Sequence, residues 1–185
     1  VAAGLLGAIV LIGIYHAGSL SSQDFRGILM AVVWTETAVI TLIAMNMSAT
    51  AVSREREDGT LDLILTTPIT PAMYLTGKLK GLVAYLLPLM MVPVGTLLLA
   101  GGYVLTGGLG RGNVSVPVAF AQVPVETPLV LPEAGLLASI VLLPFLAFCV
   151  IIGLNWSLKS KGTIGSVVAT VGVVGVVGGT IGLCG

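Results

Sequence analysis

The residue types that could carry chemistry in this chain are concentrated in one short segment. Five consecutive charged residues, Arg54 to Asp58, stand in a chain of 185 residues in which only 9% are charged. Carboxylates and guanidinium groups can cap helix ends and contact charged partners, and burying them unpaired is costly. We therefore expect segment 53–71 to be hydrated and to form a contact surface for a partner in the aqueous phase.

A short helix is predicted inside this segment. Asp58 can cap its N-terminus by accepting a hydrogen bond from a free amide. Apolar residues follow at the i, i+3, i+4 spacing of a helical stripe: Leu61, Ile64 and Leu65. Pro68 ends this pattern. Thr70 and Pro71 then predict the start of the next helix, because threonine caps helices and proline tolerates the first helical position.

Glu36 is a second candidate, because it lies inside the apolar run 27–52. A carboxylate within a membrane costs about 3 kcal/mol or more, so it is expected to face a partner or a water-filled cavity. Two interpretations remain open. Glu36 either lines a substrate or proton route, or it makes a structural hydrogen bond with a hydroxyl group of its own or a neighbouring helix.

Residue patterns typical of enzymes, metal sites and nucleotide sites are not found. His16 is the only histidine and has no second ligand at metal-binding spacing. The pair Gly77-Lys78 is followed by Leu79 and lacks the earlier glycine of a phosphate-binding loop. We therefore expect no cofactor, no metal and no catalytic activity in this chain.

Long apolar runs must position these groups. Five can be drawn, at about 1–17, 27–52, 79–105, 135–154 and 162–185. Each is long enough, or nearly so, to cross a bilayer as a helix of about 20 residues. The sequence predicts an all-α polytopic bundle, with residues 1–185 forming one transmembrane domain in membrane lipid. Its net charge of zero gives no reason to expect nucleic acid as a partner.

The basic residues predict which loops face the cytosol. If the first span leaves the cytosol, loops 53–78 and 155–161 and their borders carry six of the eight basic residues: Arg54, Arg56, Lys78, Lys80, Lys159 and Lys161. The opposite side keeps Arg26 and Arg111. This distribution follows the positive-inside rule, so loop 53–78 is predicted to be cytosolic. The long loop 106–134, rich in Gly and Pro, is predicted to be extracytoplasmic and to contain short extended pieces.

The glycines of the last run predict close helix packing. Gly175 and Gly179 stand at small-xxx-small spacing, and Gly182 continues the cluster. Without side chains, helix backbones can approach each other closely in lipid. We interpret this surface as intramolecular helix packing, with a dimer contact as the alternative.

The stretch from Glu55 to Gly81 resembles the intracellular loop of ABC-2 type permeases, the membrane subunits of a class of ATP-binding-cassette transporters. The matching order is a glutamate-rich start, Gly-Thr-Leu, a leucine-rich helix, Thr-Pro, and Gly-Lys at the next span. The residues are Glu55, Glu57, Gly59, Thr60, Leu61, Leu63, Leu65, Thr67, Pro68, Gly77 and Lys78. The order of spans extends the resemblance over most of the chain.

This resemblance implies that the loop contains the coupling helix on which a cytosolic ATPase docks. The residues implied are Glu55, Glu57, Gly59, Thr60, Leu61, Leu63, Ile64, Thr67 and Pro68. It also implies an exporter in a bacterial inner (plasma) membrane, built from two permease copies or paralogues and two ATPase subunits. The family has six spans, so we expect this five-span chain to be a piece of a longer protein.

Two other functions remain open from the residues alone. One is a carrier or channel that works without a motor, in which the charged segment serves as a gate or sets the topology. The other is a membrane scaffold subunit that binds a cytosolic partner without moving a substrate.

Overall fold

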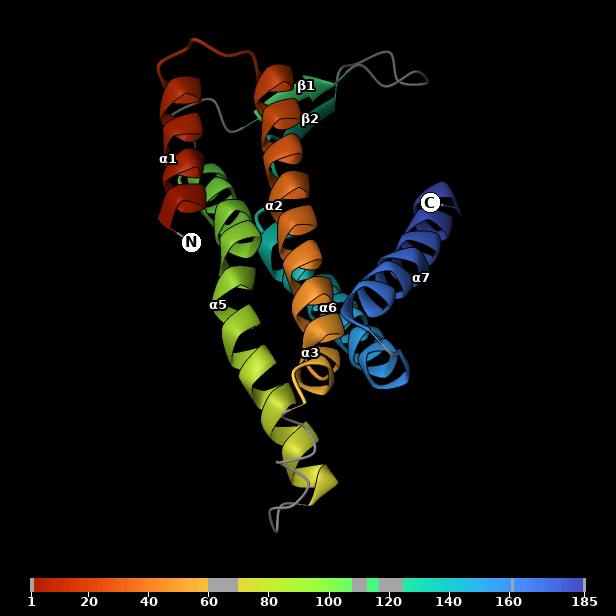
Figure 1. Cartoon of the computed structure of the whole chain (residues 1–185). Coiled ribbons are helices and arrows are strands. Elements are labelled where there is room, and N and C mark those ends of the chain that lie inside the picture. Colours follow the sequence, from red (N-terminus) through yellow and green to blue (C-terminus); the bar gives the residue numbers. More distant parts are fainter. Residues whose placement is uncertain (1, 60–69, 108–112, 117–124, 161, 185) are drawn as a thin grey trace. The chain divides into compact units, whose positions relative to one another are not determined.

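The structure is a computed structural model that describes residues 2–59, 70–107, 113–116, 125–160 and 162–184 (Figure 1). Most of them lie in five long helices: α1 (Ala2–His16), α2 (Ser22–Thr50), α5 (Pro71–Leu105), α6 (Ala134–Lys159) and α7 (Thr163–Cys184). The described ranges also hold one short helix, α3 (Ser53–Glu57), and two strands, β1 (Asn113–Val116) and β2 (Val125–Pro128). The predicted helical membrane fold is confirmed.

Three helices in the described ranges are long and apolar enough to cross a membrane: Ser22–Glu57, Ala72–Leu105 and Ala134–Lys159. Two shorter apolar helices accompany them, Ala3–His16 and Thr163–Val177. Their outward surfaces carry large apolar side chains, with Trp34 69%, Ile140 69% and Ile164 80% exposed. Such surfaces are unusual on water-soluble monomers and are expected where lipid surrounds the helices.

Two helix starts follow the local rules of capping. The Ser21 hydroxyl accepts a hydrogen bond from the Asp24 N–H at 3.2 Å and donates one to the Asp24 carboxylate at 2.6 Å, at the start of α2. The Thr70 hydroxyl accepts one from the Met73 N–H at 3.3 Å at the start of α5, and Pro71 is the first residue of that helix. The predicted start at Thr70 and Pro71 is confirmed.

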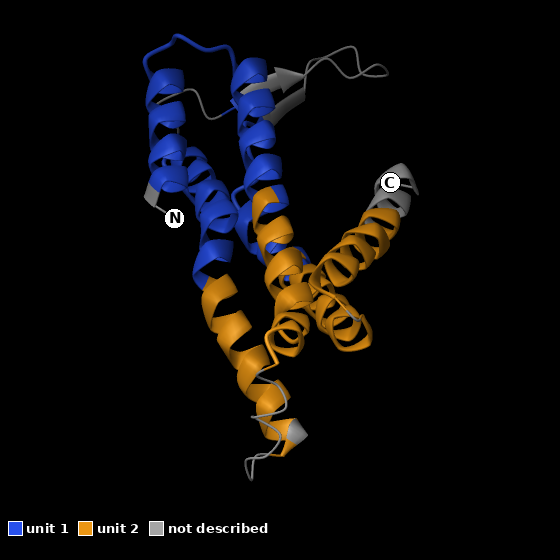
Figure 2. Cartoon of the chain, viewed as in Figure 1, with its two compact units in different colours: residues 1–38, 88–141 blue, residues 39–87, 142–185 orange. Residues whose placement is uncertain are grey.

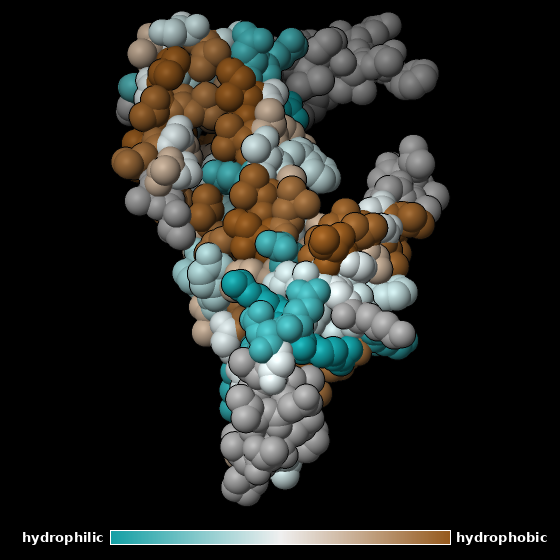
Figure 3. All heavy atoms as spheres, viewed as in Figure 1, coloured by the Kyte–Doolittle hydropathy of each residue, from teal (hydrophilic) through white to brown (hydrophobic). Residues whose placement is uncertain are grey.

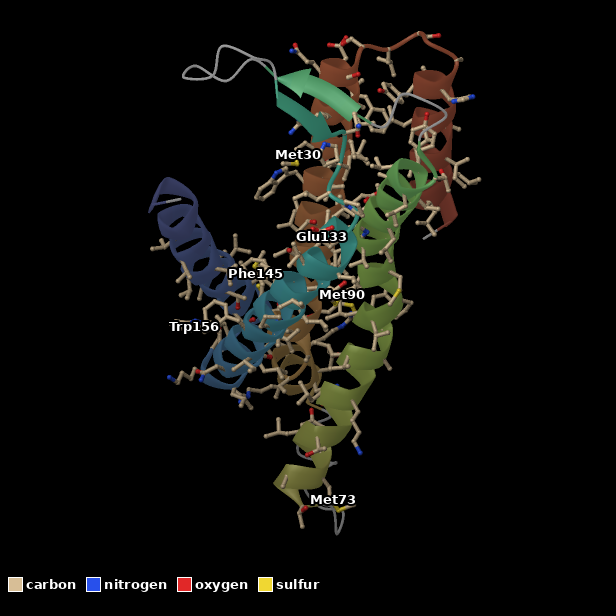
Figure 4. All side chains as sticks on the ribbon, turned by 180° about the vertical axis from the view of Figure 1, so that it is seen from behind. Met30, Met73, Met90, Glu133, Phe145 and Trp156 are labelled. Atoms are coloured by element: carbon tan, nitrogen blue, oxygen red, sulfur yellow. The ribbon has the colours of Figure 1, made fainter. Side chains whose placement is uncertain are left out.

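The chain divides into two compact units, residues 1–38 with 88–141 and residues 39–87 with 142–185 (Figure 2). The first unit has a core of Leu11, Tyr15, Phe25, Leu29, Ala100 and Leu129. The second has a smaller core in which Met45, Cys149 and Val174 pack with Phe145 and Ile152. Both Phe145 and Trp156 project from α6 (Figure 4).

A two-stranded hairpin occupies part of the long loop in the first unit. Strands β1 and β2 pair antiparallel, from Asn113 opposite Pro128 to Val116 opposite Val125. Directly after β2, Leu129 is only 1% exposed and packs in the core of this unit. The short extended pieces predicted in loop 106–134 are therefore present, and Leu129 fixes the end of the hairpin to the helices.

Candidate functional site

The charged segment is helical at its start. Helix α3 lies in the second unit and begins where the backbone N–H groups of Val52 and Ser53 need acceptors. Both donate to the Ser157 hydroxyl oxygen on α6, at 3.0 and 2.9 Å. All three residues are at most 1% exposed. A side chain more than a hundred residues away thus caps this helix, because α3 has no cap of its own at Val52.

A buried layer of hydroxyl groups lies next to this cap. The hydroxyls of Ser53 and Ser166 both donate to the Ala49 carbonyl, at 2.9 and 2.8 Å, and their oxygens lie 3.3 Å apart. The Ser166 hydroxyl also lies 2.8 Å from the Thr163 carbonyl oxygen. In an apolar environment such hydrogen bonds satisfy polar groups that would otherwise be costly to bury. They connect the end of α2, the start of α3 and the start of α7.

Arg56 on α3 contacts the end of α6. Its guanidinium Nη1 donates to the Ser160 carbonyl at 3.0 Å, and Nη2 donates to the Leu158 carbonyl at 3.1 Å. The last carbonyls of a helix have no intrahelical partner and carry the negative end of the helix dipole. A cation with two donors in a fixed plane is well suited to this position.

Glu57 contacts the start of α7. Its carboxylate accepts the Thr163 N–H at 2.7 Å and the Thr163 hydroxyl at 3.0 Å. Free amides and the positive end of the dipole make a helix N-terminus favourable for a carboxylate. Arg56 and Glu57 therefore bind oppositely polarised helix ends, one on each side of the α6–α7 connection.

Glu55 contacts α5. Its carboxylate accepts hydrogen bonds from the Tyr74 hydroxyl and the Lys78 ammonium group, and it forms an ion pair with Lys78. The Lys78 Nζ also lies 5.7 Å from the centre of the Tyr74 ring. The three side chains at 55, 56 and 57 therefore reach α5, α6 and α7 in turn.

An open groove borders this ion pair. It has a volume of about 590 Å³ and is lined by Met47, Met73, Tyr74, Gly77, Lys78, Gly81 and Leu82. Met73 lies near the N-terminal end of α5 (Figure 4) and is 68% exposed. Figure 3 shows hydrophilic side chains gathered around α3 and the adjoining end of α6, next to apolar helix surfaces.

The predicted site residues are only partly covered by the described structure. Glu55, Glu57 and Gly59 are described, and Gly59 has a positive φ of 69° just after α3. Asp58 caps the C-terminus of α3, with its N–H bonded to the Arg54 carbonyl at 2.9 Å. The other predicted residues, and the predicted 60–66 helix, lie outside the described residues: Thr60, Leu61, Leu63, Ile64, Thr67 and Pro68.

Sequence reasoning missed that residues 53–57 form a helix, and it missed the partners of that helix. Ser157 lies within the short stretch predicted as loop 155–161, and Thr163 lies two residues after it; their hydroxyl groups were the available signal. Helix α6 extends to Lys159, further than the predicted end of its apolar run at 154. The polar end of this helix is what α3 contacts.

Glu36 lies in the first unit and has a hydroxyl partner on another helix. The Thr96 hydroxyl on α5 donates to its carboxylate at 3.2 Å, and Thr96 is fully buried. Helix α1 comes close at Gly4, where a Cβ would lie 2.8 Å from Glu36 Oε1. The Thr96 hydroxyl is therefore a hydrogen-bond partner from a neighbouring helix, as the interpretation of Glu36 as a structural residue requires.

The remaining predicted positions have simple surroundings. His16 ends α1, and its Nδ1 lies 3.3 Å from the Tyr103 hydroxyl. No group of three or more His, Cys, Asp or Glu that could hold a metal ion occurs among the described residues. At Gly175 a Cβ would meet no described atom within 4 Å. The surroundings of Gly179 and Gly182 are not described, so their packing role stays a prediction.

Comparison with known protein families gives a match over most of the chain. The family described as ABC-2 family transporter protein matches residues 8–183, nearly the whole chain. No curated protein matches, and no solved structure matches.

Proposed function

Because the chain belongs to the ABC-2 transporter family, it is a membrane permease of ATP-binding-cassette transporters, and we propose that it exports its substrate with a separate ATPase docked on segment 53–71. The observation that supports this most directly is the position of α3. Its consecutive charged side chains contact α5, α6 and α7, so a force applied to this segment reaches three helices.

The motor is proposed to be another polypeptide. A transport subunit of this family works with an ATP-binding-cassette ATPase, and this sequence has no phosphate-binding loop of its own. Gly77-Lys78 is followed by Leu79, where such a loop needs a hydroxyl group for Mg²⁺. ATP hydrolysis then takes place in the partner. This chain converts the movement of the ATPase into a change in the side of the membrane to which the substrate path is open.

The proposed orientation follows from the charges. Segment 53–78 faces the cytosol of a bacterial cell and loop 106–134 faces outward, since six of the eight basic residues flank the cytosolic side in this arrangement. The working complex contains two permease units and two ATPases. ATP-driven closure of the motor pushes the 59–68 region, and the second and third spans tilt to open the path on the other side.

Cross-linking tests the docking site. A cysteine is placed at Thr60 or Leu63, and the full chain is co-expressed with a candidate ATP-binding-cassette ATPase. We expect a cross-link to the ATPase in a complex that still transports. The absence of any cross-link in a functional complex would contradict the docking proposal. Transport by vesicles that contain the chain without an ATPase would instead favour a motor-independent carrier.

A further inference from the structure

Arg56 and Glu57 hold the two helix ends on either side of the α6–α7 connection. We propose that these two are positioning residues, which link the charged helix α3 to this connection so that a displacement of α3 is transmitted to α7. The inference rests on the proposed function, because it takes the docked ATPase as the source of the displacement. The displacement of α3 would then reach α7 as well as α5.

The contacts are suited to transmitting movement because each one fixes direction as well as distance. The Arg56 guanidinium donates to two carbonyls at the end of α6, those of Ser160 at 3.0 Å and Leu158 at 3.1 Å. The Glu57 carboxylate accepts from both the N–H and the hydroxyl of Thr163. Two-point contacts of charged groups are stronger and more directional than single neutral hydrogen bonds.

The buried layer next to these contacts makes the connection stiff. Ser53 and Ser166 share the Ala49 carbonyl, and Ser157 holds the first amides of α3. These three serines are at most 1% exposed, so water does not compete for their hydrogen bonds. Rotating α3 away from α7 would break several of these bonds together, which favours movement of the two as one body.

The neighbouring charges serve as matched controls. Arg54 and Asp58 flank the pair on the same segment, and both are exposed. Neither side chain makes a hydrogen bond to a residue in the described parts of the chain. Arg54→Gln therefore removes the same charge as Arg56→Gln without removing a hydrogen bond within the described parts of the chain. On the α7 side, Thr163→Val removes the hydroxyl contact without altering the docking segment, and Thr163→Ser restores it.

Hydrogen–deuterium exchange tests the inference in the full chain, reconstituted in nanodiscs with its ATPase. Exchange in segments 53–59 and 158–166 is compared without nucleotide and with ATP bound to a hydrolysis-deficient ATPase. For the wild type, Arg54→Gln and Thr163→Ser we expect ATP to change exchange in both segments. For Arg56→Gln and Thr163→Val we expect the full change in 53–59 and a smaller change in 158–166, because the Thr163 N–H bond to Glu57 and the serine layer remain.

The outcomes separate the inference from the proposed function. Without nucleotide, Arg56→Gln should exchange about tenfold faster in 158–166 than Arg54→Gln, because a charged hydrogen bond is lost. Equal exchange in the two variants would overturn the link itself. An ATP response of 158–166 that is as large in Arg56→Gln and Thr163→Val as in the wild type would overturn its role in transmission. If no ATPase binds the wild type, the proposed function and the transmission both fail, and the nucleotide-free comparison still decides the link.

Discussion

Gly153 on α6 lies so close to Ser48 on α2 that a Cβ at position 153 would be 1.9 Å from the Ser48 Oγ and 3.1 Å from the Ala49 backbone nitrogen. No side chain fits there without moving a backbone. The close approach brings α6 beside the end of α2, one turn of helix before Ser157 caps α3. The glycine is thus a condition for the contacts of α3.

Gly153→Ala is expected to lower the stability of the second unit by about 1–3 kcal/mol, because the added methyl group overpacks a tight contact. Gly13→Ala is the control, since a Cβ at Gly13 would meet no described atom within 4 Å. Thermal unfolding can be followed in detergent with a fluorogenic thiol dye, because the Cys149 thiol is buried in the folded protein. Equal melting temperatures for the two variants would contradict this prediction.

Ser157→Ala is expected to destabilise the protein by about 1–3 kcal/mol, since it leaves the amides of Val52 and Ser53 buried without an acceptor. Ser139→Ala on the same helix is the control. Among the described residues, the Ser139 hydroxyl donates to the Gly135 carbonyl of its own helix and to no other helix. The same dye assay should give a lower melting temperature for the first variant only. A similar decrease in both would show that the loss of any α6 hydroxyl has this effect.

Thr70→Ala is expected to weaken the start of α5 by about 1 kcal/mol, because the Met73 amide loses its cap. Thr70→Ser keeps a hydroxyl at the same place and should behave as the wild type. Limited proteolysis near residues 70–73 measures the effect, with faster cleavage expected in the alanine variant. Equal cleavage of all three proteins would argue against a capping role.

Glu36→Gln is expected to leave transport within about twofold of the wild type, since the amide oxygen can still accept the Thr96 hydroxyl. Thr96→Val should lower stability by about 1–3 kcal/mol, because the partly buried Glu36 carboxyl loses this donor. Substrate-stimulated ATPase activity of the complex and the dye assay measure the two effects. Loss of transport in a normally assembled Glu36→Gln complex would instead assign Glu36 to a substrate or proton route.

The parts of this fold that depend on neighbouring residues could be predicted from the sequence. Apolar run length predicted the helices, and Thr70 with Pro71 predicted the start of α5, because spanning and capping depend on neighbouring residues. The family resemblance directed attention to Glu55 and Glu57. The partners of α3 could not be predicted, because the choice of Ser157 or Thr163 depends on how distant helices pack. For Glu36, the sequence predicted that the carboxyl group needs a partner, but it could not predict that this partner is Thr96.

The cap of α3 also constrains how the protein is made. Val52 and its acceptor Ser157 are 105 residues apart in the sequence. At about 5–20 residues per second, a ribosome needs roughly 5–20 s to synthesise the chain between them. During that interval the first amides of α3 have no protein acceptor from α6 and must stay hydrated at the membrane surface. In the orientation proposed above, the nascent charged segment is therefore accessible from the cytosol before the second half of the chain enters the bilayer.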